Sequence, residues 1–212
     1  MLKSFIISFC SVLTIIFSLS SNNSSSAGVS NTSSEEAVVQ EPWQISPSCN
    51  QVNAISDIMF GEGENQSLSA KKDLGYFLIS EASKSGRTLC QELNYRMPGG
   101  DLKYSSMHKN LNKLKEDRAS SYKIIREQAE NFWKEDKDNY RKMSKYNHYI
   151  TLSLAKNRPP SWFKYYIRSY YISGDHVFAD LDFRNKHQAR KSGKYLPNYN
   201  RLIKDINALK KA

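Results

Sequence analysis

The sequence predicts an α+β domain that is mostly helical, carries one small β element, and follows an export signal and a polar tether. Three observations support this prediction. Apolar residues recur at helical spacing through much of the region after residue 46. One stretch near residue 170 has the aromatic and β-branched character of a strand. Residues 20–40 are almost wholly Ser, Asn and other small residues, which cannot bury a core.

The N-terminus has the three parts of a secretory signal peptide. Lys3 gives a short positive segment, residues 5–19 form an apolar run, and small residues follow up to Ala27. The run is shorter than the roughly 20 residues that span a bilayer, which favours a cleaved signal over a permanent anchor. We therefore expect residues 1–27 to be a signal peptide, with only transient membrane contact and export to the periplasm or the cell exterior. Residues 28–45 are expected to be a disordered tether.

The folded domain is expected over residues 46–183, beginning with two helices. Val52, Ile55, Ile58 and Met59 have helical spacing, which predicts a first helix that ends at Gly61. A second helix is expected over residues 67–82, with Ser67 or Ser69 as its N-cap.

The rest of the domain is predicted more coarsely. Residues 86–100 have the composition of a loop, and the polar stretch 107–154 predicts two or three amphipathic helices. Pro159 and Pro160 break the chain before a short helix over 161–168. Residues 170–178 predict an extended segment with a turn at Gly174 and Asp175. The aromatic residues between 162 and 171 fit either a packed core or a groove that stacks on sugars.

The net charge of +10 is concentrated in residues 184–212, which hold nine Lys or Arg residues and one Asp. We expect this segment to be a basic C-terminal tail that binds anionic cell-envelope polymers. The export signal and the lack of a nucleic-acid-binding motif exclude nucleic acid as the expected partner. A charge balance tuned only for solubility is the alternative.

Two cysteines, Cys49 and Cys90, remain after the signal segment. In an oxidising compartment an even pair predicts a disulfide, and two unpaired thiols are the alternative. The four histidines are scattered and no CxxC motif occurs, so no metal and no cofactor is expected.

Glu62 is the main candidate for chemistry because it follows an apolar run and enters a Gly-broken polar segment. A carboxyl group held half-buried at the end of a helix, over a cleft, suits general-acid cleavage of a glycosidic bond. A solvated loop carboxylate is the alternative.

Four segments, in order, resemble the SleB-type cell-wall hydrolases, which include spore-cortex-lytic and phage-borne enzymes related to lytic transglycosylases. The family motif Tyr-x-Glu-Ala-Arg-Gly-Glu resembles residues 58–65 (IMFGEGEN), and the helix that follows it resembles residues 73–81. A Val-Cys segment and a Gln-Phe-Ser element correspond to residues 88–93 and 103–105. The family's Gly-Asn-His plus aromatic resembles residues 174–178 (GDHVF). The family arginine after the glutamate is absent here, and its Asn-Arg pair is replaced by Ser80 and Glu81.

The resemblance implies a lysozyme-like fold that cleaves peptidoglycan between N-acetylmuramic acid and N-acetylglucosamine. Glu62 would be the general acid and base, and no second carboxylate would be needed if the muramoyl 6-hydroxyl attacks. Glu64 and Glu81 are the nearby acids that would serve a two-carboxylate hydrolysis instead. The substrate-binding residues would be Tyr104, Ser105, His176 and Phe178, each of which is otherwise a packing or surface residue.

Two further classes remain beside this hypothesis. The first is a non-enzymatic basic protein that binds the wall or the membrane, such as a lysis accessory or an effector. In such a protein Glu62 would be dispensable. An exported enzyme of another kind has no support, because no Ser-His-Asp set, P-loop or zinc motif is present.

Overall fold

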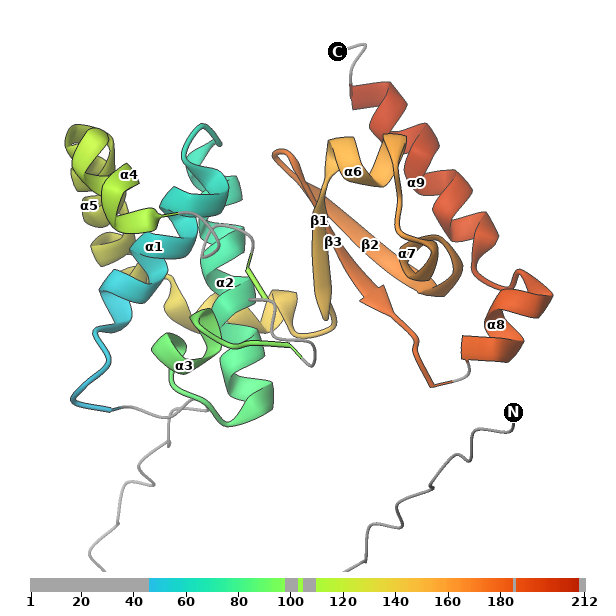
Figure 1. The fold of residues 1–212 in the computed structure, drawn as a ribbon, viewed down its shortest axis with the longest axis horizontal. Coiled ribbons are helices and arrows are strands. Elements are labelled where there is room, and N and C mark those ends of the chain that lie inside the picture. Colours follow the sequence, from blue (N-terminus) through green and yellow to red (C-terminus); the bar gives the residue numbers. More distant parts are fainter. Residues whose placement is uncertain (1–45, 98–102, 105–109, 185, 210–212) are drawn as a thin grey trace, which may run out of the picture. The chain divides into compact units, whose positions relative to one another are not determined.

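The computed structural model describes residues 46–97, 103–104, 110–184 and 186–209, which belong to one compact unit, Gln40–Ala212. The described part is mostly helical and has a small three-stranded antiparallel sheet, so the α+β prediction is confirmed at this level (Figure 1). The expected signal peptide, the tether and Ser105 lie outside the described residues. In the ranges that are described, no helix has the length and apolar character needed to span a bilayer.

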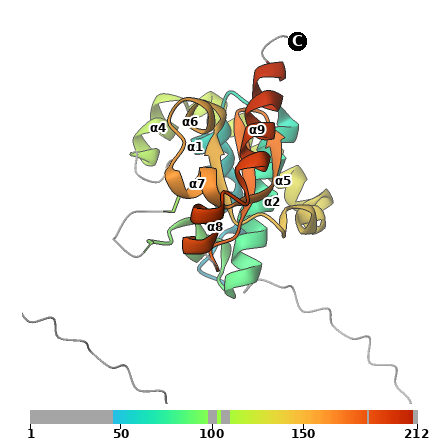
Figure 2. The ribbon, with the colours of Figure 1, turned by 90° about the vertical axis from the view of Figure 1, so that its right-hand side faces the viewer.

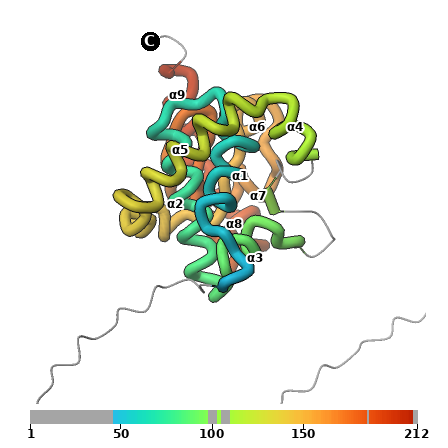
Figure 3. The backbone as a smooth tube through the Cα atoms, turned by 90° about the vertical axis from the view of Figure 1, so that its left-hand side faces the viewer, coloured from blue at the N-terminus to red at the C-terminus, as the bar shows by residue number. Residues whose placement is uncertain are grey.

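Helices form the first part of the domain. Asn50 caps α1 by accepting a hydrogen bond from the Asn53 N–H at 2.9 Å, and Ser67 caps α2 as predicted. Figure 3 shows α5 beside α1, which also packs against α2. The bounds are α1 (Gln51–Gly63), α2 (Leu68–Ser85), α3 (Leu89–Leu93), α4 (Leu111–Asp117), α5 (Ala119–Glu135) and a 3₁₀ helix, η2 (Lys137–Met143).

Two of these helices differ from the sequence prediction. The first helix runs to Gly63 rather than Gly61, so Glu62 lies in its last turn. The segment expected as a loop contains α3, where Thr88 and Gln91 form a capping box. That pair is a local signal in the sequence that the loop assignment overlooked.

The sheet has the order β1–β3–β2, with β1 at His148–Thr151, β2 at Ile167–Ser173 and β3 at His176–Leu181. The predicted extended segment is the β2–β3 hairpin, and its turn lies at Gly174 and Asp175 as expected. β1 falls inside the stretch predicted to be helical, and that prediction was wrong. Four residues carry little periodicity, and β1 becomes a strand by pairing with β3, far away in the sequence.

The side chains of the sheet alternate between two hydrophobic cores. Phe178, with Tyr149 opposite it on β1, joins the core of α1, α2, α3 and α5. Val177, Ala179 and Leu181 point the other way and join a second core. β3 is therefore buried on both faces.

Four helices cover the second face: α6 (Leu152–Asn157), α7 (Ser161–Tyr166), α8 (Lys186–Ser192) and α9 (Leu196–Leu209). Figure 2 views the domain from this side, with α9 lying across the sheet. Phe163 and Tyr166 of the aromatic cluster are buried in this core, which favours packing over a sugar groove for these two residues.

The segment expected to be a basic tail is part of this core. α9 buries Tyr199, Leu202 and Ile206, and its exposed face carries Arg201 and Lys204. Composition alone suggested a tail because the apolar residues are few. They are spaced so that they lie on one face of a helix, which is sufficient to dock it.

Cys49 and Cys90 form a disulfide, as the even cysteine count suggested. The bridge joins the residue before the α1 cap to the first turn of α3. Because it closes a loop across 41 positions, chain-entropy estimates give it a stabilisation of about 4 kcal/mol.

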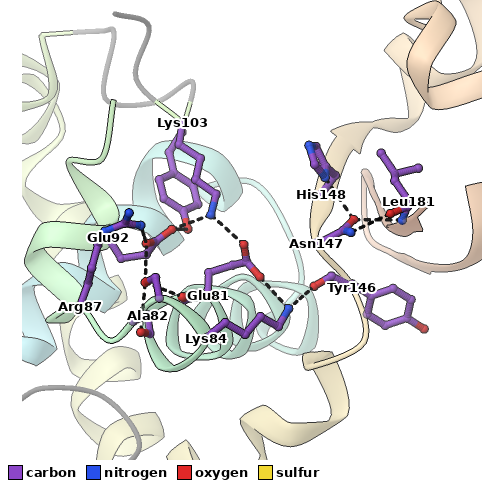
Figure 4. A network of polar contacts seen from close by, with 12 residues as sticks. Glu81, Ala82, Lys84, Arg87, Glu92, Lys103, Tyr146, Asn147, His148 and Leu181 are labelled. Carbon is purple, nitrogen blue, oxygen red and sulfur yellow. Dashed lines mark hydrogen bonds and ion pairs between the residues drawn. The ribbon is translucent and has the colours of Figure 1, made fainter. Parts of the chain in front are cut away.

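A cluster of buried charges ties α2 and α3 to the short described segment 103–104 (Figure 4). Lys103 Nζ lies 2.7 Å from Glu81 and 2.6 Å from Glu92. Arg87 donates to the other oxygen of Glu92 at 2.8 Å, and Lys84 bridges Glu81 to the backbone oxygen of Tyr146. Each buried carboxylate thus meets two cations, which compensates for its desolvation.

We expect this cluster to make the fold acid-sensitive. Burial opposes the charge of Glu92, but Lys103, Arg87 and Ser85 outweigh it and hold its pKa below the ordinary value of 4.5. A carboxyl group with a depressed pKa stabilises the fold above its unfolded pKa, and this contribution is lost as the pH falls through the folded value. The urea midpoint should therefore decline below pH 4.5. In Glu92→Gln the midpoint should already be lower at neutral pH, with a weaker acid dependence; parallel curves for both proteins would contradict this assignment.

Leu202→Ala tests whether the C-terminal segment belongs to the domain. Leu202 is fully buried, so its truncation should lower the unfolding free energy by about 2–5 kcal/mol in urea denaturation. Lys204→Ala, on the exposed side of the same helix, is the matched control and should change it by less than about 0.5 kcal/mol. Equal midpoints for both variants would mean that the segment is a dispensable tail.

Candidate active site

Glu62 lines a cavity of about 320 Å³, at the point where the helices meet the tip of the β2–β3 hairpin. Its side chain is partly buried, as the sequence predicted for a carboxyl group at a helix end. The cavity is lined by residues of α1 and the loop after it, of α4 and its C-cap, and of the hairpin turn: Phe60, Gly61, Glu62, Glu64, Asn65, Gln66, Leu114, Arg118 and Asp175.

The end of α1 is held close to α2 by a glycine. A Cβ atom on Gly63 would lie 2.8 Å from Leu74 Cδ1, so a larger residue would force the helices apart. The chain then turns, with the Gln66 N–H bonded to the Gly63 oxygen at 2.9 Å. Glu62 therefore projects from a packed helix end rather than from a loose loop.

Gln66 fixes the hairpin turn to this end of α1. Its amide nitrogen donates to Asp175 Oδ2 at 2.8 Å, and its amide oxygen accepts from the Asp175 N–H at 2.8 Å. Gly174 has a φ of 53°, and a Cβ atom there would lie 2.2 Å from the Gln66 oxygen. This two-point contact brings β3, and with it His176, to the carboxyl group of Glu62.

Tyr149 is the direct partner of Glu62. Burial, followed by the charge and hydrogen bond of Glu62, raises the pKa of the Tyr149 hydroxyl well above its ordinary value. Tyr149 therefore stays protonated and donates to the Glu62 carboxylate. The sequence analysis did not select Tyr149, because its segment was predicted to be helical.

His176 lies against Tyr149, with 5.5 Å between the ring centroids, and only 2% of the residue is exposed. Burial lowers its pKa, although the charges of Glu62 and Asp175 oppose that shift. The imidazole is therefore neutral at neutral pH. Its Nδ1 atom has no hydrogen-bond partner among the described residues.

Two of the predicted substrate contacts are core residues instead. Tyr104 and Phe178 are both fully buried, so neither reaches the cavity. The ring of Tyr104 stacks on Tyr149 at 6.2 Å, and its hydroxyl lies 3.3 Å from Glu92. Both residues were selected for their chemical type, but in the fold they support Tyr149 and His176 from within the core.

The other acids of the cavity have partners of their own. Glu64 forms an ion pair with Arg118, and Asp175 is held by Gln66. Glu81, considered earlier as a second carboxylate, does not line this cavity and belongs to the buried charge cluster. Asp175 takes its place as the acid to test, and its signal in the sequence was its position in the Gly-Asp-His motif.

Within the described ranges, no group of three or more His, Cys, Asp or Glu side chains is arranged to hold a metal ion. The cavity thus offers the carboxyl group of Glu62, which can hold and transfer a proton. The Tyr149 phenol bonds that carboxyl group, but neither Tyr149 nor the predicted substrate contact His176 lines the cavity itself. No family model, no curated protein and no solved structure matches the chain.

Gly174→Ala should separate backbone strain from the contact with Gln66. Alanine at a positive φ is strained, at a cost of about 1–3 kcal/mol, and at Gly174 it would also displace Gln66. Gly86→Ala is the matched control, because Gly86 has a φ of 64° with nothing within 4 Å of the added Cβ. Thermal denaturation should show a larger loss for Gly174→Ala. Equal losses would mean that the hairpin tip is not clamped by Gln66.

Proposed function

We propose that this protein is an exported enzyme that cleaves the glycan backbone of peptidoglycan as a lytic transglycosylase, with Glu62 as general acid and base. The observation that carries the proposal is the kind of partner that each acid of the cavity has. Glu64 bonds a cation and Asp175 an amide, whereas Glu62 bonds the neutral hydroxyl of Tyr149. A neutral hydroxyl beside a carboxyl group can donate a hydrogen bond to the carboxylate that forms when the proton is released.

In the first step, protonated Glu62 donates its proton to the oxygen of the β-1,4 bond between N-acetylmuramic acid and N-acetylglucosamine. The bond from the anomeric carbon to that oxygen breaks, and N-acetylglucosamine leaves as an alcohol. Glu62 is then a carboxylate, which the Tyr149 hydroxyl stabilises by hydrogen bonding.

In the second step, the Glu62 carboxylate takes the proton of the muramoyl 6-hydroxyl. The oxygen of that hydroxyl bonds to the anomeric carbon, giving a 1,6-anhydro end and returning Glu62 to its protonated form. One carboxyl group serves both steps, and no water is consumed.

The arrangement of the domain supports a lysozyme-like fold as part of this proposal. The acid lies at the end of a helix in an α-rich part, and a small antiparallel sheet reaches the same cavity through its hairpin tip. The exposed basic face of α8 and α9 would add attraction to anionic envelope polymers through a salt-screened field. The expected signal peptide would deliver the enzyme to that substrate.

Glu62→Gln should abolish cleavage and keep the fold. Gln is nearly isosteric with a protonated carboxyl group and can accept the Tyr149 hydrogen bond, but it cannot deliver a proton. Loss of a general acid costs on the order of 100- to 10,000-fold in rate. The measurement is turbidity clearance of purified sacculi by the mature protein, with a thermal melt of each variant. Near-wild-type clearance by a folded Glu62→Gln variant would exclude the proposed mechanism.

Three further substitutions measure how much each neighbour of Glu62 contributes to the rate of cleavage. Tyr149→Phe removes a hydrogen bond to a charged group, worth roughly 2 kcal/mol, so the rate should fall about 30-fold. Glu64→Gln and Asp175→Asn should each cost less than about tenfold, because neither is a nucleophile in this mechanism. A collapse in Asp175→Asn equal to that in Glu62→Gln would instead favour a two-carboxylate hydrolase.

Mass spectrometry of the released material separates the remaining alternatives. Anhydro-muropeptides support the transglycosylase, and reducing ends support the hydrolase. Binding to sacculi without any release would favour the non-enzymatic, basic wall-binding protein.

A further inference from the structure

Two more cavities lie along α6, and they form a series with the Glu62 cavity through shared lining residues. The first, of about 380 Å³, shares Asp175 with the Glu62 cavity and is also lined by Lys156 and Ile206. The second, of about 440 Å³, shares Thr151 and Ser153 with the first and extends to Asn157 and Arg158. We call these two cavities the α6 arm.

The α6 arm is fixed relative to the Glu62 cavity by backbone hydrogen bonds. The Leu152 N–H donates to the carbonyl oxygen of Asp175 at 2.8 Å, directly at the hairpin turn. Thr151 caps α6 by accepting from the Leu154 N–H at 3.2 Å, and Thr151 is also the β1 residue paired with His176. A substrate bound at Glu62 and reaching past Asp175 would therefore meet α6 in a set position.

The lining of the arm combines the apolar side chains of Leu152, Leu154 and Ile206 with polar and cationic groups. Lys156 and Arg158 have no ion-pair partner among the described residues, and Asp175, the acid in the lining, is engaged by Gln66. Thr151, Ser153 and Asn157 add hydroxyl and amide groups. No aromatic side chain lines either cavity, so the arm lacks the flat apolar faces on which sugar rings stack.

We propose that the α6 arm binds the acidic stem peptide carried by the muramic acid residue at the Glu62 cavity, with Lys156 and Arg158 contacting its carboxylates. This proposal rests on the proposed function. Peptide carboxylates match the two cations by charge, and the guanidinium of Arg158 can bind a carboxylate through two parallel hydrogen bonds. An uncharged run of further sugars would leave both cations without a role. The enzyme therefore prefers glycan that still carries its peptides.

The test compares two substrates and two double variants. Intact sacculi carry stem peptides, and sacculi treated with N-acetylmuramoyl-L-alanine amidase do not. Lys156→Gln with Arg158→Gln should slow release from intact sacculi about tenfold, as expected for two partly exposed ion pairs, and should leave release from the amidase-treated sacculi unchanged. Arg141→Gln with Lys191→Gln removes the same charge from exposed positions outside the described cavities, and should affect both substrates alike.

A binding measurement makes the inference independent of turnover. Calorimetry should show that the wild-type protein binds a muropeptide disaccharide with its tetrapeptide about tenfold more tightly than the peptide-free disaccharide. The Lys156→Gln, Arg158→Gln variant should lose this preference, with a thermal melt to show that it is folded. No release by the wild type, with the binding preference present, would overturn the proposed function alone. Equal affinity of the wild type for both disaccharides, or equal losses by the variant on both kinds of sacculi, would overturn the peptide-binding arm.

Discussion

The burial of β3 on both faces is the constraint on which the rest of the domain depends. Such a strand needs a backbone partner on each edge, and β1 and β2 supply them. It also needs an apolar cover on each face, which explains why helices from both ends of the chain close over one small sheet. Because β3 is so constrained, its first residue, His176, has a fixed place beside Tyr149.

A chain of contacts links the buried charges to the acid. Lys103 forms ion pairs with Glu81 and Glu92, and these ion pairs position the next residue, Tyr104, in the core. The ring of Tyr104 stacks on Tyr149, which is the hydrogen-bond partner of Glu62. Buried ion pairs add little net stability, since desolvation offsets their attraction, but they allow few alternative arrangements. We infer that this cluster serves the placement of Tyr149 more than the free energy of folding.

The electrostatics of the cavity and of its surroundings have different roles. At the cavity, the Tyr149 hydroxyl bonds Glu62, Arg118 forms an ion pair with Glu64, and Gln66 bonds Asp175. Away from it, Lys156 is partly exposed, and Arg158 and the bases of α8 and α9 are exposed to solvent. A polymer that carries carboxylates along an uncharged backbone fits this division, because its backbone enters the cavity and its charges remain on the rim.

The sequence by itself determined the elements that depend on local chemistry. The caps of α1 and α2, the turn at Gly174 and Asp175, and the position of Glu62 near a helix end all follow from neighbouring residues. The tertiary structure decided what depends on contacts distant in the sequence. β1 is a strand only because β3 pairs with it, and Tyr104 and Phe178 are core residues only because two layers close over them. α9 is a docked helix because its few apolar residues meet a sheet face. Asp175 joins Glu62 at one cavity because the hairpin folds onto the end of α1. Tyr149 reaches the Glu62 carboxyl group because β1 pairs with β3, and no local pattern encodes either placement.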